Sequence, residues 1–388
     1  MVQMLIEENQ IDLSSIYIDG TKIEAYANRY SFVWRGSIEK YQEKLRIKVI
    51  ECLGLNENST AEEVLEVVRM FFNQIAKECT DKNIEFAYGQ GKRKHKLRRD
   101  YETLKDWKEK LEKYKEHLEI MGEHRNSYSK TDHEATFMRM KEDHMKNGQL
   151  KAAYNVQLAS ASGFIIGENI SHHPSDMYTL KPFVRGLLEN YPNKLEKIVA
   201  DSGYESEENY VFLAEKGLNS YIKPSNYEKS KTRKYKKDME FRNSLIYDEK
   251  QDKYLSLDGK EFTRCKDKYR KRESGYVSIT KVYRCFDWNK EGEKTKGIYI
   301  SETFQKYREI SLKNIKSPQG IEERINRSIQ AEGAFSKLKD GLSYNRFHHK
   351  GKANAISEIN LLSIALNLNK LESKIIKKNL KIIKYKAA

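Results

Sequence analysis

Residues 195–209 read LEKIVADSGYESEEN, and this stretch decides the fold. Its apolar part, Ile198 to Ala200, is typical of a short buried strand that stops at Asp201. Two turn-forming residues follow, and Ser206 suits a helix N-cap because the next two residues are glutamates, which the helix dipole favours in a first turn. Open α/β sheets hold functional groups at such a position, the carboxyl end of a central strand on a turn into a helix. The alternative is that Asp201 only begins the turn.

A second carboxylate stands near the start of the chain. Residues 15–25, SIYIDGTKIEA, are predicted to form two short strands around the turn Asp19-Gly20-Thr21, because Asp-Gly is a strong turn signal. Asp19 would then also lie at a strand end before a small turn. The alternative is an ordinary hairpin aspartate.

The order of the expected elements links these two acids. After the first strand, residues 37–127 are helical and charged, and Ala153–Gln157 and Gly163–Ile170 then form an expected antiparallel strand pair. A helix and the strand before Asp201 follow. Without the helical insertion this is an α/β order of ribonuclease-H-like type, a mixed sheet in which Asp19 and Asp201 leave adjacent strands.

A third acid lies on a predicted helix over residues 319–339. Glu332 stands seven residues before Lys339, so both side chains are expected near one helix face, two turns apart. The alternative is a solvent-facing Glu held by a cation one turn away. The residues three and four positions to either side are all uncharged, which argues against that alternative: Ser328, Ile329, Phe335 and Ser336.

The predicted division of the chain has four parts. These are 1–36 with 128–225 as the first part of the α/β core, 37–127 as a helical insertion, 226–318 as a small β-rich insertion, and 319–388 as the Glu332 helix and a closing helix of the core.

Composition points to a polyanionic partner. The 388 residues include 72 Lys+Arg against 57 Asp+Glu, a net charge of +15. Such a surplus suits nucleic acid, because clustered cations release counterions from phosphates. No apolar run is long enough to span a membrane, and the N-terminus lacks the pattern of a signal peptide. Four scattered cysteines without CxxC spacing fit a reducing cytoplasm.

Several segments, in this order, resemble the DDE-type transposases of bacterial insertion sequences, in the group that carries an insertion before the catalytic Glu. The segments are IDGTKIEA (18–25), ATFMRMKEDHMKNGQ (135–149), AYNVQ (153–157), ADSGYESEENY (200–210), IQAEGAFSKLK (329–339) and YNRFHHKG (344–351). The resemblance implies Asp19, Asp201 and Glu332 as a catalytic triad that holds Mg²⁺, with Mn²⁺ as a substitute. It implies DNA contacts by four further residues: Lys339, Tyr204, Arg327 and Arg346.

The implied function is strand cleavage and strand transfer at insertion-sequence ends. The implied partners are the double-stranded inverted repeats and target DNA, bound by a homodimer or larger assembly. Some relatives have Tyr and Arg seven and four residues before the Glu, where this chain has Ile325 and Ser328. Relatives with a cysteine cluster bind a structural zinc in the insertion, and with only Cys265 and Cys285 there we expect none.

Two alternatives stay open at this point. Only 18 residues precede Asp19, where relatives carry a helical DNA-binding region, which favours a truncated, catalytically inactive remnant that only binds DNA. The other alternative is a structural RNA-binding protein that uses a surface rich in Tyr and Lys, which a preference for RNA over DNA would reveal.

Overall fold

The computed structural model describes residues 1–82, 95–140, 148–288 and 294–377. The chain forms two compact units. The first combines Met1–Ile23 with Tyr154–Ala388, and the second is Glu24–Ala153. All residues predicted for the site lie in the first unit.

The first unit is built on a mixed sheet with the strand order β5-β1-β7-β8, in which β6 also pairs with β5. The strands are β1 (Ser15–Glu24), β5 (Leu150–Ala161), β6 (Phe164–Ser171), β7 (Lys197–Ala200) and β8 (Asn219–Ile222). β5 and β6 pair antiparallel, whereas β7 is parallel to both β1 and β8. The predicted α/β class, the antiparallel pair and the adjacency of β1, which carries Asp19, to β7, which precedes Asp201, are confirmed.

The predicted hairpin around Asp19 is wrong. Residues 15–24 form one continuous strand, so the Asp-Gly pair continues β1 instead of reversing the chain. The reason lies in a neighbouring strand: a Cβ on Gly20 would overlap the side-chain amide of Gln157 from β5. Gly20 therefore allows a close approach between two strands, which is the other common use of a glycine within a strand.

We expect Gly20→Ala to lower the free energy of unfolding by about 1–3 kcal/mol, the usual range for overpacking. Gln157 cannot move away easily, because its Nε2 donates to Asn155 Oδ1 at 2.8 Å and to Asp176 Oδ1 at 3.1 Å. Urea denaturation measures the effect. Gly186→Ala is the matched control, because nothing lies within 4 Å of its added Cβ, and it should leave stability unchanged or higher. Equal stability of the two variants would contradict the packing argument.

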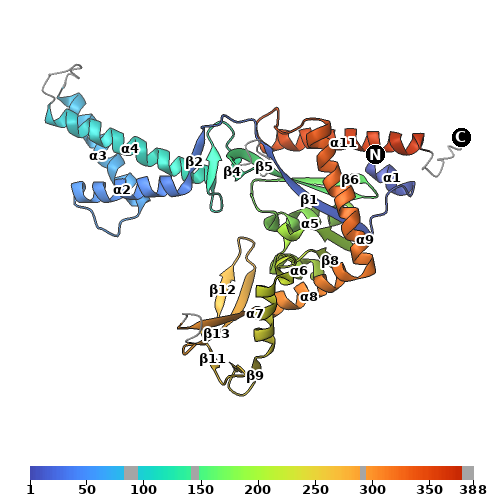
Figure 1. Cartoon of the computed structure of the whole chain (residues 1–388). Helices are drawn as coiled ribbons and strands as arrows, with labels where there is room; N and C mark the ends of the chain where they lie inside the picture. Colours follow the sequence, from blue (N-terminus) through green and yellow to red (C-terminus); the bar gives the residue numbers. More distant parts are fainter. Residues whose placement is uncertain (83–94, 141–147, 289–293, 378–388) are drawn as a thin grey trace. The chain divides into compact units, whose positions relative to one another are not determined.

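Helices cover this sheet (Figure 1). They are α1 (Val2–Glu7), α5 (Leu180–Asn190), α6 (Glu207–Glu215), α8 (Glu302–Lys316) and α11 (Lys352–Ile376). The main core gathers apolar side chains from both sheet and helices, including Ile16, Ile198, Phe183 and Leu213. Ser206 caps α6 as predicted, since its side chain accepts the backbone N–H of Asn209. In the ranges the structure describes, no helix is long and apolar enough to cross a membrane.

The predicted helix over 319–339 is a composite. It starts as α9 (Pro318–Arg327), widens into the π-helical segment η4 (Ser328–Glu332), returns to α-helix in α10 (Gly333–Ser336) and widens again in η5 (Lys337–Gly341). Ser317 caps its start by accepting the N–H of Gly320, and Ala331 is buried against Tyr17 and Val199 of the sheet. Single π-turns of this kind are frequent at functional sites.

A second, antiparallel sheet lies between residues 246 and 300. It follows α7 (Arg233–Asn243) and has the strand order β12-β13-β11-β10-β9, with β14 paired to β13. The strands are β9 (Ile246–Asp248), β10 (Lys253–Leu255), β11 (Glu261–Arg264), β12 (Lys268–Lys271), β13 (Val277–Cys285) and β14 (Lys296–Ile300). A core of its own, around Phe262, Tyr283 and Trp288, supports it.

Three long helices lie in the described residues of the second unit, α2 (Arg35–Leu53), α3 (Ala61–Asp81) and α4 (Lys96–Met121). Thr60 and Glu63 form a complete capping box at the start of α3, and Leu104, Trp107 and Leu111 of α4 pack against apolar residues of the other two helices. Two short strands pair with each other, β2 (Phe32–Trp34) and β3 (Ser127–Ser129), and β4 (Thr136–Arg139) pairs with residues 150–153.

A buried ion pair fixes the segment that follows Asp201. Both oxygens of Glu205 accept hydrogen bonds from Arg308 of α8, at 2.7 and 2.9 Å, and the Glu205 side chain is only 2% exposed. Burial raises the pKa of this carboxyl, but the hydrogen bonds from Arg308 and Ser225 outweigh burial, and the pKa lies below its ordinary value. The ion pair therefore stabilises the folded protein at pH values above the ordinary pKa of a glutamate. This stabilisation is lost as the pH falls through the lowered pKa of Glu205.

We expect Arg308→Met to lower the unfolding free energy by about 3–5 kcal/mol at neutral pH, because a buried carboxylate is left without its partner. The deficit should shrink as acid protonates Glu205, which denaturation at several pH values would show. Lys281→Ala is the control, since it breaks the exposed pair with Glu302 and should change stability by less than about 1 kcal/mol. A deficit that stays constant with pH would contradict the ion-pair explanation.

Candidate active site

Asp19 lies on β1, and Asp201 directly follows the adjacent strand β7. The register of the parallel pair sets Tyr17 opposite Val199, and two further residues along each strand lead to Asp19 and Asp201. The Asp201 side chain also accepts the backbone N–H of Gly203 at 2.8 Å, so it does begin the turn. The turn uses only the Oδ1 atom of Asp201. Beginning the turn is therefore compatible with a role for Asp201 in the candidate site.

Glu332 reaches this pair of acids through Arg327. One guanidinium nitrogen of Arg327 lies 3.7 Å from Asp19 Oδ1, and another lies 2.5 Å from Glu332 Oε1. Ser328 Oγ donates to the other Glu332 oxygen at 2.9 Å. Arg327 thus bridges two of the three predicted acids.

The sequence argument against a solvent-facing Glu332 held by a cation is wrong, because the Glu332 side chain is 49% exposed and pairs with Arg327. The π-helical segment explains why. In an α-helix, side chains three and four residues apart share a face. A π-turn makes hydrogen bonds between residues five apart, so η4 brings Arg327 to Glu332 across a spacing of five. The π-helical form of this segment, which the residue spacing did not reveal, therefore determines that Arg327 is the partner of Glu332.

Asp19 is the most perturbed carboxyl of the site. Burial, more than any other influence, raises its pKa to about 6. Arg327 acts in the opposite direction, and the nearby charges of Asp201 and Glu332 raise the pKa further. Burial and the two neighbouring acids thus act together against ionisation of Asp19, and Arg327 offsets them only in part.

A buried polar layer supports the acids. Tyr204 is fully buried, its hydroxyl donates to Gln157, and burial followed by the charges of Asp176, Asp19 and Asp201 raises its pKa well above the ordinary value. We therefore assign Tyr204 a supporting role in place of the expected DNA contact. Asp176 is an acid that sequence reasoning missed as a site neighbour. It accepts hydrogen bonds from Asn155 and Gln157, and the polar residues within the AYNVQ strand were the available signal.

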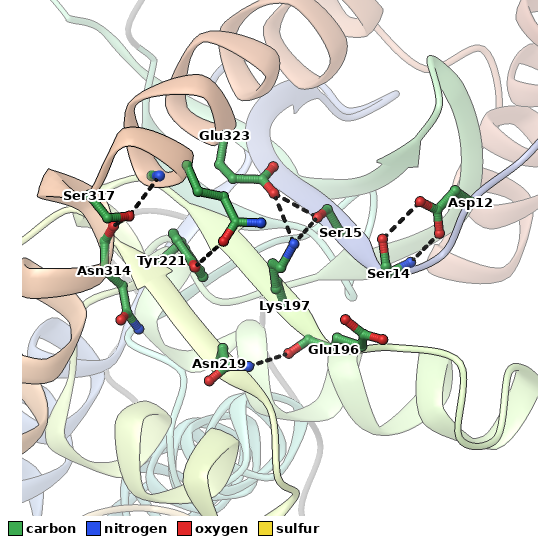
Figure 2. A network of polar contacts seen from close by, with 12 residues as sticks. Asp12, Ser14, Ser15, Glu196, Lys197, Asn219, Tyr221, Asn314, Ser317 and Glu323 are labelled. Carbon is green, nitrogen blue, oxygen red and sulfur yellow. Dashed lines mark hydrogen bonds and ion pairs between the residues drawn. The ribbon is translucent and has the colours of Figure 1, made fainter.

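A second buried network fastens α9 to the sheet. Glu323 of α9 accepts hydrogen bonds from Tyr17 at 2.6 Å and Ser15 at 2.8 Å, and Lys197 of β7 lies 3.3 Å away. Figure 2 shows Glu323 pointing from the helix toward Ser15 and Lys197. Glu323 is one turn before Arg327 on the helix, and Tyr17 is two residues before Asp19 on β1. The hydrogen bond between Glu323 and Tyr17 therefore positions the helix along β1 so that Arg327 lies beside Asp19.

The other two residues predicted to contact DNA lie beyond Glu332. Lys339 is half-buried in η5, and Arg346 is exposed on the loop before α11. Glu358 of α11 holds that loop, since its carboxylate accepts hydrogen bonds from the Tyr344 hydroxyl and the backbone N–H groups of His348 and His349. These hydrogen bonds therefore anchor the loop on both sides of Arg346.

The predicted divalent cation can be compared with the donors present. Within the described ranges, no three His, Cys, Asp or Glu residues are close enough together to form a ready metal site. The donor set does fit Mg²⁺, because all three predicted ligands are carboxylates and Mg²⁺ prefers oxygen. The Arg327 guanidinium already serves as a cation between Asp19 and Glu332, so these two carboxylates accept positive charge between them.

Residues 257–372 match the family model described as Transposase DDE domain, so this part of the chain carries a transposase DDE domain. The matched part contains Arg327 and Glu332 and extends into α11, but it does not reach Asp19 or Asp201. No curated protein and no solved structure gives a match.

Proposed function

We propose that this protein is a DNA transposase that cleaves and transfers strands at insertion-sequence ends through the acids Asp19, Asp201 and Glu332. The observation that carries the proposal is the bridge from Glu332 to Asp19. Glu332 belongs to the part that matches the DDE domain, and Arg327 ties it to Asp19, whose strand is adjacent to the one that Asp201 follows. Three carboxylates from distant parts of the chain thus share one neighbourhood.

We further propose that the sheet is of ribonuclease-H-like type. The supporting features are the antiparallel pair β5–β6, the central position of β1, and the parallel strands β7 and β8 beyond it. The inserted sheet between residues 246 and 300 precedes the Glu332 helix, as the resemblance to transposases with an insertion before the catalytic Glu implies.

In this proposal Asp19, Asp201 and Glu332 hold Mg²⁺, or Mn²⁺ in its place. When bound, such ions activate the attacking oxygen and stabilise the charge on the leaving oxygen of a phosphodiester. The chain itself supplies the position of the three carboxylates. β1 and β7 fix the two aspartates, and the Glu323 network holds the helix that carries Glu332.

The cationic residues complete the proposed site. Lys339 and Arg346, beyond Glu332 in the chain, would contact the DNA backbone, while Arg327 orients Asp19 and Glu332. Double-stranded DNA, as inverted repeats and as target, is the proposed substrate, and a homodimer or larger assembly on DNA would pair two element ends.

A nicking assay tests the proposal. Purified protein is incubated with supercoiled DNA carrying the element ends, in Mg²⁺, in Mn²⁺ and in chelator. We expect nicked product with either cation and none in chelator. Retarded DNA in a mobility-shift assay without cleavage under any cation would instead support the remnant that only binds DNA.

A further inference from the structure

A cavity of about 480 Å³ opens beside the proposed site, on the side of Asp201. Ala200 and Asp201 at the end of β7, Lys223 just after β8, and one face of α9 and η4 line it. Its volume lies within the range of small-ligand pockets, about 300–1,000 Å³. Asp201 lines the cavity and is also one of the three proposed catalytic acids. A molecule bound in the cavity would therefore lie directly beside the proposed catalytic site.

The charge of the cavity wall favours an anion. The wall contains Lys223, Arg324 and Arg327 against the single carboxylate of Asp201. Arg327 is already engaged by Asp19 and Glu332, which leaves Lys223 and Arg324 as the cations able to meet a ligand.

These two cations lie against one aromatic ring, which Lys231 also faces at 4.8 Å. Lys223 Nζ and the Arg324 guanidinium each lie 5.3 Å from the centre of the Tyr227 ring. Lys223 also pairs with Glu228 at 2.8 Å, a carboxylate whose side chain is 62% exposed and therefore well hydrated. Within the part of the chain that the structure describes, Arg324 forms no ion pair, so its charge is uncompensated at the wall.

The rest of the wall is apolar. Ile321, Ile325 and Ile329 follow one another at four-residue spacing and are each more than half exposed. Isoleucines exposed in a row beside cations suit a ligand with charge along one side and hydrocarbon along the other. A DNA strand offers both kinds of contact, since its charged phosphates alternate with deoxyribose rings that present C–H groups.

We propose that the DNA strand next to the cleaved phosphodiester runs through this cavity, with Lys223 and Arg324 contacting its phosphates and Ile325 facing its sugars. The inference rests on the proposed function and deepens it, because it assigns a strand-binding subsite to residues that the resemblance does not name. Tyr227 acts as a positioning residue that orients both cations.

Binding without chemistry tests the subsite. A labelled DNA duplex is titrated in chelator with wild-type protein and with the double variant Lys223→Gln/Arg324→Gln, at several salt concentrations. We expect at least about tenfold weaker binding and a salt dependence whose slope falls by about 1.8, for two lost phosphate contacts at about 0.9 each. The matched control is Arg185→Gln/Lys306→Gln, which removes the same charge from α5 and α8, outside the cavity lining.

A second measurement locates the contact. Duplexes in which one phosphate at a time is a neutral methylphosphonate should reveal a position that weakens wild-type binding but has no effect on Arg324→Gln. Ile325→Asp should also weaken binding, whereas Ile325→Leu should not. Circular dichroism confirms that each variant is folded.

The outcomes separate this inference from the proposed function. If the double variant binds DNA as tightly as the wild-type protein, or loses no more affinity than the control variant, the proposed subsite is wrong. The proposed cleavage would then still be tested by the nicking assay. Wild-type protein that binds through Lys223 and Arg324 but never nicks DNA overturns the proposed cleavage and supports the subsite. Failure of the wild-type protein to bind DNA at all overturns both.

Discussion

Asp201→Asn is expected to reduce cation-dependent DNA nicking by roughly 10²- to 10³-fold or more, the range seen when one preorganised electrostatic group is lost from an active site. The substitution removes a negative charge and almost nothing else. An asparagine Oδ1 can still accept the N–H of Gly203, so the turn after β7 should be retained. A loss of nicking would then report the charge and not the fold.

The measurement compares nicking rates with DNA binding in the same preparation. Binding should stay within about twofold of the wild-type value, because Asp201 is an acid and does not contribute phosphate contacts. The matched control is Asp340→Asn, which makes the same chemical change at an exposed position of the composite helix, where Asp340 accepts a hydrogen bond from Ser336. Wild-type nicking by Asp201→Asn would remove Asp201 from the catalytic group.

Arg327→Gln should make the protein less stable without divalent cations and more responsive to them. In chelator we expect the free energy of unfolding to fall by about 1–3 kcal/mol, because the hydrogen bond to Glu332 and the ion pair with Asp19 are both lost. Asp19 and Arg327 are 18% and 17% exposed, so solvent screens their interaction only in part.

The response to cations follows from competition. A ligand that binds only the folded protein stabilises it according to its affinity, and in the wild-type protein a cation must displace Arg327 from Asp19 and Glu332. Without Arg327 that competition is absent, so Mg²⁺ should raise the melting temperature more in the variant than in the wild-type protein. Thermal denaturation with and without Mg²⁺ measures both effects.

Arg324→Gln is the control for this experiment, since Arg324 lies on the same helix and, in the ranges described, forms no ion pair. It should leave both the stability in chelator and the shift caused by Mg²⁺ unchanged. A shift of equal size in wild-type and Arg327→Gln protein would show that the cation and Arg327 do not compete for the same carboxylates.

Local patterns in the sequence predicted the elements around Asp201 well. The apolar run before it, the turn residues after it and the Ser206 cap are all interactions between residues close in the chain. The order of strands and helices was also sufficient to place Asp19 and Asp201 on adjacent strands. Short-range propensity and connection order follow from the sequence alone, because they depend on neighbouring residues and on chain length.

Tertiary structure decided the rest of the candidate site. Gly20 continues a strand because Gln157, far along the chain, fills the space where a side chain would lie, and local turn propensity could not reveal this. Asp176 joins the surroundings of the acids through the same glutamine. Arg327 bridges Asp19 and Glu332 because a π-turn shifts the helix register by one residue.

The sequence was therefore sufficient to set Asp201 at the end of β7 and Asp19 on the neighbouring strand, whereas the position of Asp19 within a continuous β1 and the cation between Asp19 and Glu332 depend on the tertiary structure. The physical reason is the range of the interactions. Propensities and caps act within one turn or strand, whereas close packing and ion pairing depend on groups that only the folded chain brings together.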